Sequence, residues 1–361
     1  MSKVTFNNKN SLFYSTLRRS VDEYFQQNRI SKTGNAHLYA KAIILFSAAA
    51  IIYTSLLTLQ MPVWAGILLS GGFGFILAGI GFNVMHDACH GGYSSKKWVN
   101  ELMGLTLNAL GGNAFIWKLK HNVVHHTYTN VDGVDDDIHK SPLMRQCHTQ
   151  KWVPAHRFQH FYVFLVYAIS SFAWIFMMDF NKYFKQQVVT TPFPKMSFGE
   201  HFIFWITKAL YAVFYIAIPV LAVGWQAWAV GFACMHACMG LTLALVFQLA
   251  HVVEETEFEF AGSEPRKIEN EWAIHQIKTT ANFARGNRFI SWWVGGLNYQ
   301  VEHHLFPRIS HVHYPAISVI VKETCHEFNL PYNECPTMTD AVVSHVRFMR
   351  ELGRKPVLAT A

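Results

Sequence analysis

Histidine is the residue type of this sequence whose spacing points most directly to chemistry, and the chain holds 20 of them. Eight lie in close clusters or at the end of a long apolar stretch: His86, His90, His121, His125, His126, His251, His303 and His304. Side chains four residues apart on a helix share one face, so His86 and His90 could bind a single metal ion. His121 and His125 have the same spacing. His126 points about 100° away from His125, which suits a position between two neighbouring ions.

Eight imidazoles are more ligands than one ion with an open coordination site can use, so we predict a site for two metal ions. Imidazole suits iron, zinc, copper and nickel alike, and the ligand type alone does not name the metal. Two divalent ions held by neutral rings keep about four positive charges, which nearby carboxylates could offset while orienting the rings. Carboxylates stand beside nearly every cluster: Asp87, Asp135, Asp136, Asp137, Glu254, Glu255 and Glu302.

The other histidines have no comparable neighbours in the sequence. A lone histidine near a membrane helix more often has a structural role than a ligand role. We therefore expect surface or hydrogen-bonding roles for His37, His139, His148, His156, His160, His201, His236, His275, His311, His313, His326 and His345.

Four apolar stretches could position the clusters at a membrane. Hydrophobic residues make up 51% of the chain and charged residues only 15%, against roughly 25% in a typical soluble domain. Residues 42–85 and 209–253 contain no Asp, Glu, Lys or Arg. Because about 20 apolar residues cross a bilayer, each block accommodates two helices and a tight turn. We predict an all-α polytopic membrane protein with two transmembrane hairpins, whose spans cover residues 42–60, 63–84, 203–223 and 229–250.

The distribution of basic residues predicts the orientation of these hairpins. The first 37 residues carry six Lys or Arg, whereas the turns at Gln60–Pro62 and Gly224–Gln226 carry none. The positive-inside rule then puts both termini and the histidines in the cytoplasm of a bacterial inner membrane, or of the endoplasmic reticulum if the source is eukaryotic. A further apolar run, 161–178, would separate His126 from His251 if it crossed. We therefore predict an interfacial or partly embedded helix there.

These boundaries divide the chain into a cytoplasmic N-terminal segment (1–40), a membrane domain (41–315) and a C-terminal helical segment (316–361). In the last segment, Ile317, Ile320 and Val321 recur at helical spacing. Thr337 with Asp340 resembles a capping box that begins a second helix. We expect both helices to form part of a cytoplasmic cap that holds the metal site. The six cysteines show no CxxC spacing and are expected to be free thiols.

The net charge of +7 favours contact with anionic headgroups or with an acidic partner protein. Nucleic acid is not an expected partner, because no long basic stretch is interleaved with stacking aromatic residues. The glycines from Gly71 to Gly81 lie in an apolar stretch without a following acidic ribose ligand. They indicate close helix packing rather than a dinucleotide-binding loop.

The motifs HDACH (His86–His90), HNVVHH (His121–His126) and QVEHH (Gln300–His304), set around two predicted hairpins, resemble those of the membrane-bound fatty acid desaturases. The resemblance covers the chain from about residue 40 to 315. Gln300, in place of the first histidine of the third motif, resembles the front-end branch. Those enzymes insert a double bond between an existing one and the carboxyl end of an acyl chain.

The resemblance implies two iron ions, O2 as co-substrate and two electrons from a reduced donor. The eight clustered histidines would be the ligands, with Gln300, Asp87 and Glu302 as further ligands or as residues that support them. The substrate would be a fatty acyl chain, as acyl-CoA or acyl-lipid. We expect it in a dry tunnel that opens at the cytoplasmic face and is lined by residues of the helices and of the aromatic stretch around Phe283–Trp293. Many front-end enzymes carry a fused cytochrome b5 domain with an HPGG motif, which this sequence lacks. We therefore expect electrons from a separate ferredoxin or cytochrome b5.

Other functions remain open at this level. A hydroxylase, or a desaturase of different regiochemistry, could use the same scaffold, because the outcome depends on how the chain lies against the oxidant. A metal transporter or a haem electron carrier is a further alternative. Those proteins favour polar or facing histidine residues within their spans, whereas the clusters here lie at the predicted helix ends.

Overall fold

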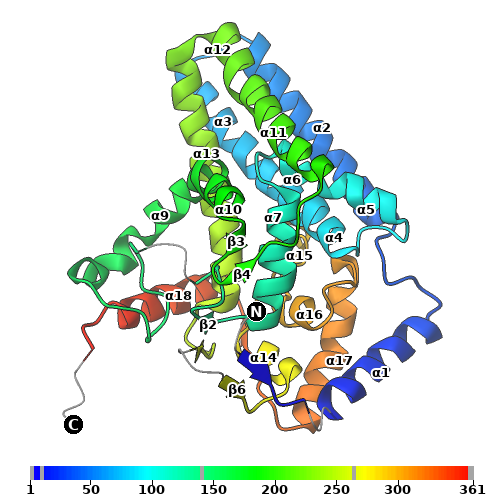
Figure 1. Ribbon diagram of the computed structural model, residues 1–361. Helices are drawn as coiled ribbons and strands as arrows, with labels where there is room; N and C mark the ends of the chain where they lie inside the picture. Colours follow the sequence, from blue (N-terminus) through cyan, green and yellow to red (C-terminus); the bar gives the residue numbers. More distant parts are fainter. Residues whose placement is uncertain (1–3, 9–11, 139–141, 262–265, 357–361) are drawn as a thin grey trace.

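The computed structural model describes residues 4–8, 12–138, 142–261 and 266–356 and is mostly helical. Long apolar helices rise from a cap of shorter helices (Figure 1). The long helices are built from α2 (Ala36–Thr58), α3 (Val63–Ile80), η1 (Gly81–Met85), α4 (His86–His90), η3 (Pro154–Phe158), α9 (Gln159–Ala173), η4 (Trp174–Met178), α10 (Asp179–Lys185), α11 (Phe198–Ala212), η5 (Val213–Ala217), α12 (Ile218–Val223) and α13 (Trp225–His251). The cap contains α1 (Leu12–Gln27), α5 (Lys97–Gly104), α6 (Thr106–Ala109), α7 (Ala114–Lys118), η2 (Leu119–His125), α8 (His126–Tyr128), α14 (Trp272–Lys278), α15 (Arg288–Trp293), α16 (Gln300–Leu305), η6 (His311–His313), α17 (Tyr314–Glu327) and α18 (Met338–Leu352).

Short strands add small two-stranded sheets that tie distant parts of the chain together. Three pairs are parallel: β1 (Val4–Phe6) with β6 (Arg266–Ile268), β2 (Val131–Asp132) with β5 (Glu259–Phe260), and β7 (Asn282–Phe283) with β8 (Glu334–Cys335). The antiparallel pair is β3 (Gln187–Val188) with β4 (Thr191–Pro192). The sheets are too short to form a layer, so helix packing determines the architecture.

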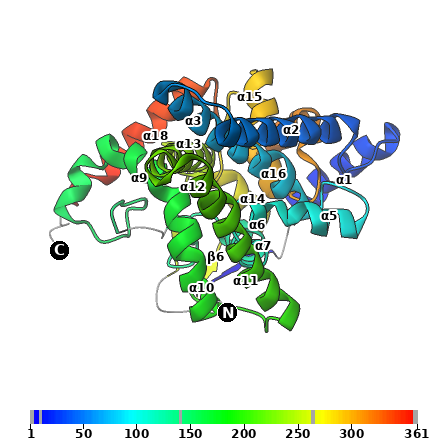
Figure 2. The same cartoon turned by 90° about the horizontal axis from the view of Figure 1, so that it is seen from above.

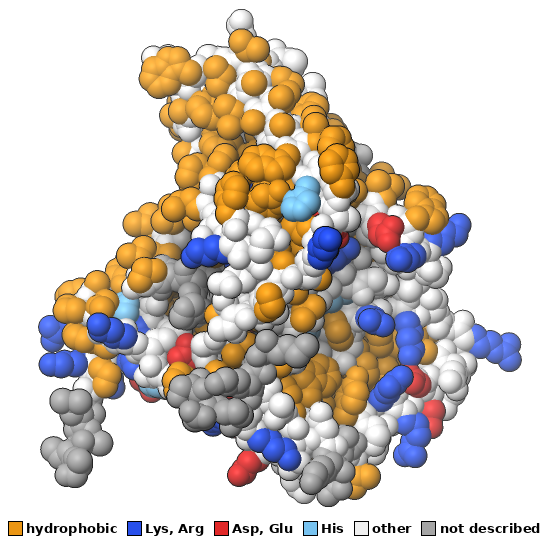
Figure 3. All heavy atoms as spheres, in the orientation of Figure 1, with side chains coloured by type: hydrophobic (Ala, Val, Ile, Leu, Met, Phe, Trp, Pro, Cys, Tyr) orange, Lys and Arg blue, Asp and Glu red, His pale blue; other side chains and the backbone are white. Residues whose placement is uncertain are grey.

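Among the described residues, five continuous helices are long and apolar enough to cross a membrane. They cover Ala36–Thr58, Val63–His90, Pro154–Lys185, Phe198–Val223 and Trp225–His251. In Figure 3, the upper part of the visible face shows hydrophobic side chains, and the coloured charged side chains gather on the lower part. The protein is therefore a multi-pass membrane protein, as its charge-free stretches predict.

The helix boundaries differ from the predicted ones for local reasons. The helix of the first predicted span, α2, begins at Ala36 because the side chain of Asn35 caps it by accepting hydrogen bonds from the His37 and Leu38 amides. The second helix passes through the π-helical η1 and continues to His90, so the HDACH motif belongs to the same helix as the span. Gly224, with φ of 83°, makes a tighter turn than predicted, and α13 begins directly after it.

The Pro154–Lys185 helix is the one that the four-span prediction does not count. Near its beginning, Gln159 Nε2 donates a hydrogen bond to the Met349 carbonyl of α18, at 2.7 Å. Near its end, Lys182 Nζ lies 2.5 Å from a carboxylate oxygen of Asp136 in the cap. Seen from above, α9 extends to one side of α13, which is viewed end-on (Figure 2). Both ends of this helix therefore contact the cap.

The two C-terminal helices form where the sequence predicts them. The Thr337 side chain accepts a hydrogen bond from the Asp340 amide, and the Asp340 carboxylate accepts one from the Thr337 amide, so the predicted capping box is confirmed. On α17, Ile317 and Val321 are buried against Leu17 of α1. The C-terminal segment is therefore part of the cap. All six cysteines are free, as predicted.

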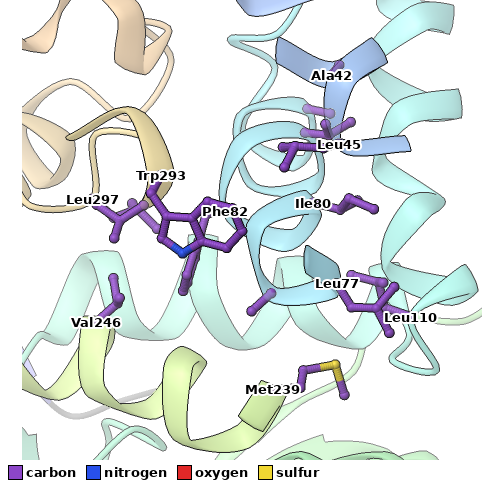
Figure 4. Packing of buried hydrophobic residues seen from close by; sticks show 14 of the residues in the cluster. Ala42, Leu45, Leu77, Ile80, Phe82, Leu110, Met239, Val246, Trp293 and Leu297 are labelled. Atoms are coloured by element: carbon purple, nitrogen blue, oxygen red, sulfur yellow. The ribbon is translucent and has the colours of Figure 1, made fainter. Parts of the chain in front are cut away.

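The bundle packs closely where α3 meets α13. A Cβ atom added to Gly74 would lie 2.0 Å from the Met235 carbonyl oxygen, so only glycine permits this approach of the two helices. The buried core continues from there to Phe82, Leu110 and Met239, which belong to one packed cluster (Figure 4). The predicted packing role of these glycines is thus confirmed at Gly74.

Candidate metal centre

The structure brings the eight clustered histidines into one buried region. The short helix α4, the π-helical η2 with α8, the last residue of α13, and α16 each contribute at least one of them. Each ring is at most 8% exposed, although the donors are spread over more than 200 residues of sequence. Histidines so deeply buried need partners for both ring nitrogens.

One group contains His86, His90, His121 and His303. One ring nitrogen from each lies within 4.8 Å of those of the other three. The Nε2 atoms of His86 and His121 are only 3.3 Å apart. Four nitrogens at this separation could together coordinate one cation.

A second group contains His125, His251 and His304, whose ring nitrogens also lie within 4.8 Å of one another. His126 lies between the groups. Its ring centroid is 4.6 Å from that of His303 and 4.3 Å from that of His304. Two adjacent clusters with one histidine between them could hold two neighbouring metal ions.

A π-helical turn sets how His121 and His125 are distributed between the groups. The sequence suggested that the two would bind one ion, but His121 belongs to the first group and His125 to the second. The two rings, together with Asp137, also form a smaller group of their own. In η2 the His126 amide bonds to the carbonyl of His121, five residues back, so the turn is wider than an α-helical one. The wide turn lets neighbouring histidines serve different groups.

Burial and mutual repulsion keep most of these rings neutral. Burial lowers the pKa of His121, His126, His303 and His304 well below the usual value, and the neighbouring imidazoles lower it further. A neutral imidazole keeps the lone pair that binds a metal. His125 differs, because the carboxylates of Asp135 and Asp137 outweigh the effect of burial and raise its pKa.

Several polar residues hold the ring nitrogens that face away from the groups. His125 Nδ1 donates to Asp135 at 3.0 Å, and His251 Nδ1 donates to the Thr279 carbonyl at 3.2 Å. The Nδ1 atom of His304 lies 2.8 Å from Gln276 Oε1. Gln276 and Thr279 carry no spacing signal in the sequence, so the sequence alone did not predict their role.

Some of the buried ring nitrogens of the clustered histidines have no hydrogen-bond partner. Among the described residues this holds for Nε2 of His90, His303 and His304 and for Nδ1 of His126. A buried polar atom without a partner is destabilising, so a cluster of them is explained if a ligand satisfies them together. The donor set is all nitrogen and fits iron, among other transition metals.

Comparison with known proteins decides the family. A family model described as fatty acid desaturase matches residues 59–336, which is most of the chain. The chain belongs to the fatty acid desaturase family. The protein is therefore an enzyme that desaturates fatty acids, and the family resemblance of its histidine motifs is confirmed.

The relatives cover nearly the full length of this desaturase. It is 36% identical over 357 residues to the sn-1 linoleoyl-lipid 6-desaturase of Arthrospira platensis, covering 98% of this chain and 96% of the relative. It is 35% identical to the protein of the same name from Synechocystis sp., covering 98% of each. The acyl-lipid (8-3)-desaturase of Physcomitrium patens is 33% identical over 96% of this chain and 72% of the relative.

Asp87, Gln300 and Glu302, which were predicted as further ligands or as residues that support the ligands, lie in different surroundings in the desaturase. Asp87 accepts hydrogen bonds from the side chains of Ser310 and His311, at 2.7 and 2.9 Å. Glu302 accepts hydrogen bonds from Asn282 and from Tyr332, at 2.9 and 2.8 Å.

Neither Asp87 nor Glu302 belongs to the histidine groups. Gln300 is buried at the first position of α16, one turn before His303 and His304. Among the described residues, its Nε2 has no hydrogen-bond partner.

Of the other predicted carboxylates, Asp135 and Asp137 approach a clustered ring. Both contact His125, at 3.0 and 3.4 Å. Asp136 pairs with Lys182 instead, and Glu255 accepts a hydrogen bond from Ser344.

The histidines predicted to be structural behave mostly as hydrogen-bonding residues. His236 contacts Ser171 and Tyr211, and His345 contacts Tyr167 and the Val252 carbonyl. His139 lies outside the described residues.

An apolar cavity adjoins the first group. It is lined by Gly81, Phe82, Met85, His86, Leu107, Leu110, Gly112, Trp117, Trp174, Ile175, Met239, Leu243 and Phe247. His86 is the one ionisable residue among them. The cavity is lined largely by residues of the long helices. Phe283 and Trp293 of the predicted aromatic stretch are not among its lining residues: Phe283 is fully buried in the core, and Trp293 stacks on Phe75 with ring centroids 4.0 Å apart.

Proposed function

We propose that this desaturase is a front-end enzyme that inserts a cis double bond into an acyl chain at a di-iron centre. The observation that carries the proposal is the pair of buried histidine groups, in which several ring nitrogens have no hydrogen-bond partner among the described residues. Gln300 in the third motif and the names of the relatives from Arthrospira and Synechocystis support the front-end assignment.

The histidines divide between the two irons by their grouping. His86, His90, His121 and His303 would hold one ion, His125, His251 and His304 the other, and His126 would lie at their junction. When bound, the irons supply an oxidant formed with O2 that is strong enough to remove hydrogen from an unactivated methylene, which no side chain can do. The protein's own residues hold the ligands in register and keep water out.

The acyl chain would enter the apolar cavity beside His86. Phe247 and Trp117, which line it, lie against the first group: their ring centroids are 6.4 and 5.6 Å from that of His86. A chain lying there would present its methylenes next to the first iron. The polar or charged head group would stay outside, because an apolar cavity cannot compensate for its lost hydration.

For the topology, we propose four spans with both termini and the metal centre on the cytoplasmic side. The contacts of Gln159 and Lys182 with the cap support this, since a helix with both ends at the cap does not change sides. His126 and His251 then share one face of the membrane. Electrons would come from a separate ferredoxin or cytochrome b5.

Expression in a host supplied with linoleoyl lipids tests the function. We expect a product with a new double bond nearer the carboxyl end and about two iron atoms per purified chain. His125→Ala should be inserted into the membrane but inactive, whereas the exposed His326→Ala should behave as the wild type. An active His125→Ala enzyme, or a fully active enzyme without iron, would contradict the proposal.

A hydroxylase on the same scaffold is the second candidate, and it is separated by the same product analysis. It would yield a hydroxyl group in place of the olefin. The family model and the names of the relatives favour desaturation.

A further inference from the structure

The cavity beside His86 follows one face of α13 away from the metal centre. Phe247, Leu243 and Met239 line it at intervals of four residues, so they lie on the same face of the helix. Phe247 is near the histidines, with its ring centroid 6.0 Å from that of His121. Met239 is eight residues further from the centre, which corresponds to about 12 Å along a helix.

The far end of the cavity is closed by rigid packing. Met239 and Ile175, which line this end, are each only 2% exposed. Further along α13, His236 Nε2 lies 3.0 Å from the Tyr211 hydroxyl, and Ser171 donates a hydrogen bond to the His236 carbonyl at 2.8 Å. These contacts tie α9, α11 and α13 together. Breaking them would leave buried polar groups unpaired, so the closed end resists displacement.

Gly81 lines the cavity without a side chain of its own, and there is room at this position for a larger residue. A Cβ atom added there would meet Leu243 at 3.7 Å and Leu110 at 3.8 Å, which are ordinary contacts with two other lining residues. Gly112 differs, because a Cβ atom there would come within 2.8 Å of Leu107. Side chains at Gly81 would therefore extend into the cavity itself.

We propose that Gly81 and Met239 determine the length of acyl chain that the enzyme accepts beyond the reacting carbons. The inference rests on the proposed function. The methyl end of the chain points toward Met239, because the closed end offers no partner for a polar head group. A side chain at Gly81 narrows the cavity midway, and a smaller residue at Met239 deepens it.

Two substitutions in opposite directions test this proposal. Gly81→Val should shift desaturation toward shorter chains, and Met239→Ala should shift it toward longer ones. Each methylene that no longer fits should weaken relative use by roughly fourfold. The measurement is product analysis with myristoleoyl, palmitoleoyl, oleoyl and gadoleoyl lipids supplied in competition, which share one cis double bond at the same distance from the carboxyl end and differ in chain length. Thermal stabilisation of the purified protein by the same series of acyl lipids gives a readout of binding that does not require turnover.

Matched controls are available on surfaces outside the cavity. Nothing lies within 4 Å of a Cβ atom built on Gly72, and the Met177 side chain is 64% exposed. Gly72→Val and Met177→Ala should keep the wild-type chain-length profile. If Met239→Ala does not fold, Met239→Phe replaces it as the test variant and should shift the profile toward shorter chains.

An unchanged chain-length profile in folded, iron-loaded Gly81→Val and Met239 variants would overturn the proposal. That result would leave the proposed function intact, because His125→Ala would still be inactive. If the proposed function itself is wrong, the His125→Ala enzyme would be active, whatever the chain-length profile.

Discussion

The two histidine groups of this desaturase lie side by side but in different surroundings. The first group borders the apolar cavity through His86, with Trp117 stacked on His121 at 4.3 Å. The second group is backed by polar partners: Asp135 behind His125, Thr279 behind His251 and Gln276 behind His304. The difference indicates that packing contributes more to holding the first group, beside which we propose that substrate lies, whereas hydrogen bonds contribute more to holding the second. Substitutions can test this division.

Removal of a ligand should have the largest effect in either group. We expect His86→Ala and His304→Ala each to lose more than about 100-fold in activity, since even residues behind the ligands cost 10- to 100-fold. Iron per chain and product yield in matched membranes measure the loss. Full iron content in His304→Ala would argue that the second group does not bind metal, and His326→Ala serves as the control.

Asp135→Asn should have the next largest effect, on the second group. The neutral amide lacks the charge that raises the pKa of His125 and holds its Nδ1 proton. We expect a loss of about 10- to 100-fold in iron affinity, measured by titration of the metal-free protein. Asp22→Asn is the matched control, because this half-buried residue of α1 pairs with Lys32 and Arg18 and lies outside the histidine groups. Wild-type affinity in Asp135→Asn would remove the proposed distinction between the groups.

Tyr314→Phe should have a smaller effect, because it acts on the first group. The Tyr314 hydroxyl lies 3.0 Å from His303 Nδ1, and the substitution keeps the ring that fills the site. We expect a change of roughly fivefold in iron affinity, the equivalent of about 1 kcal/mol for one hydrogen bond. A loss as large as that of Asp135→Asn would mean that the first group also depends on hydrogen bonds.

Thr337→Ala should give the smallest effect and serves as a baseline for both groups. The substitution removes the N-cap hydrogen bond of α18, which should lower the free energy of unfolding by about 1 kcal/mol and leave iron content unchanged. The melting temperature of the iron-loaded protein measures this loss of stability. Loss of iron from this variant would show that the packing of α18 stabilises the metal centre as a whole.

Local spacing in the sequence was enough to predict that the clustered histidines come together and that the protein is a helical membrane protein. The charge-free stretches predicted the apolar helices, and the histidine motifs predicted the ligand candidates and the family. Both signals are readable because they repeat within one or two helical turns or lie in one uninterrupted stretch. The capping box of Thr337 and Asp340 was predictable for the same reason.

Only the tertiary structure decided how those residues combine. It assigned His121 and His125 to different larger histidine groups around a π-helical turn, and it brought Gln276 to His304 and Tyr314 to His303. It also formed an apolar cavity along α13. These outcomes depend on contacts between segments far apart in the chain, such as Thr129 with Gln276 across 147 residues. A local pattern carries no information on such contacts, because the packing of whole helices sets them.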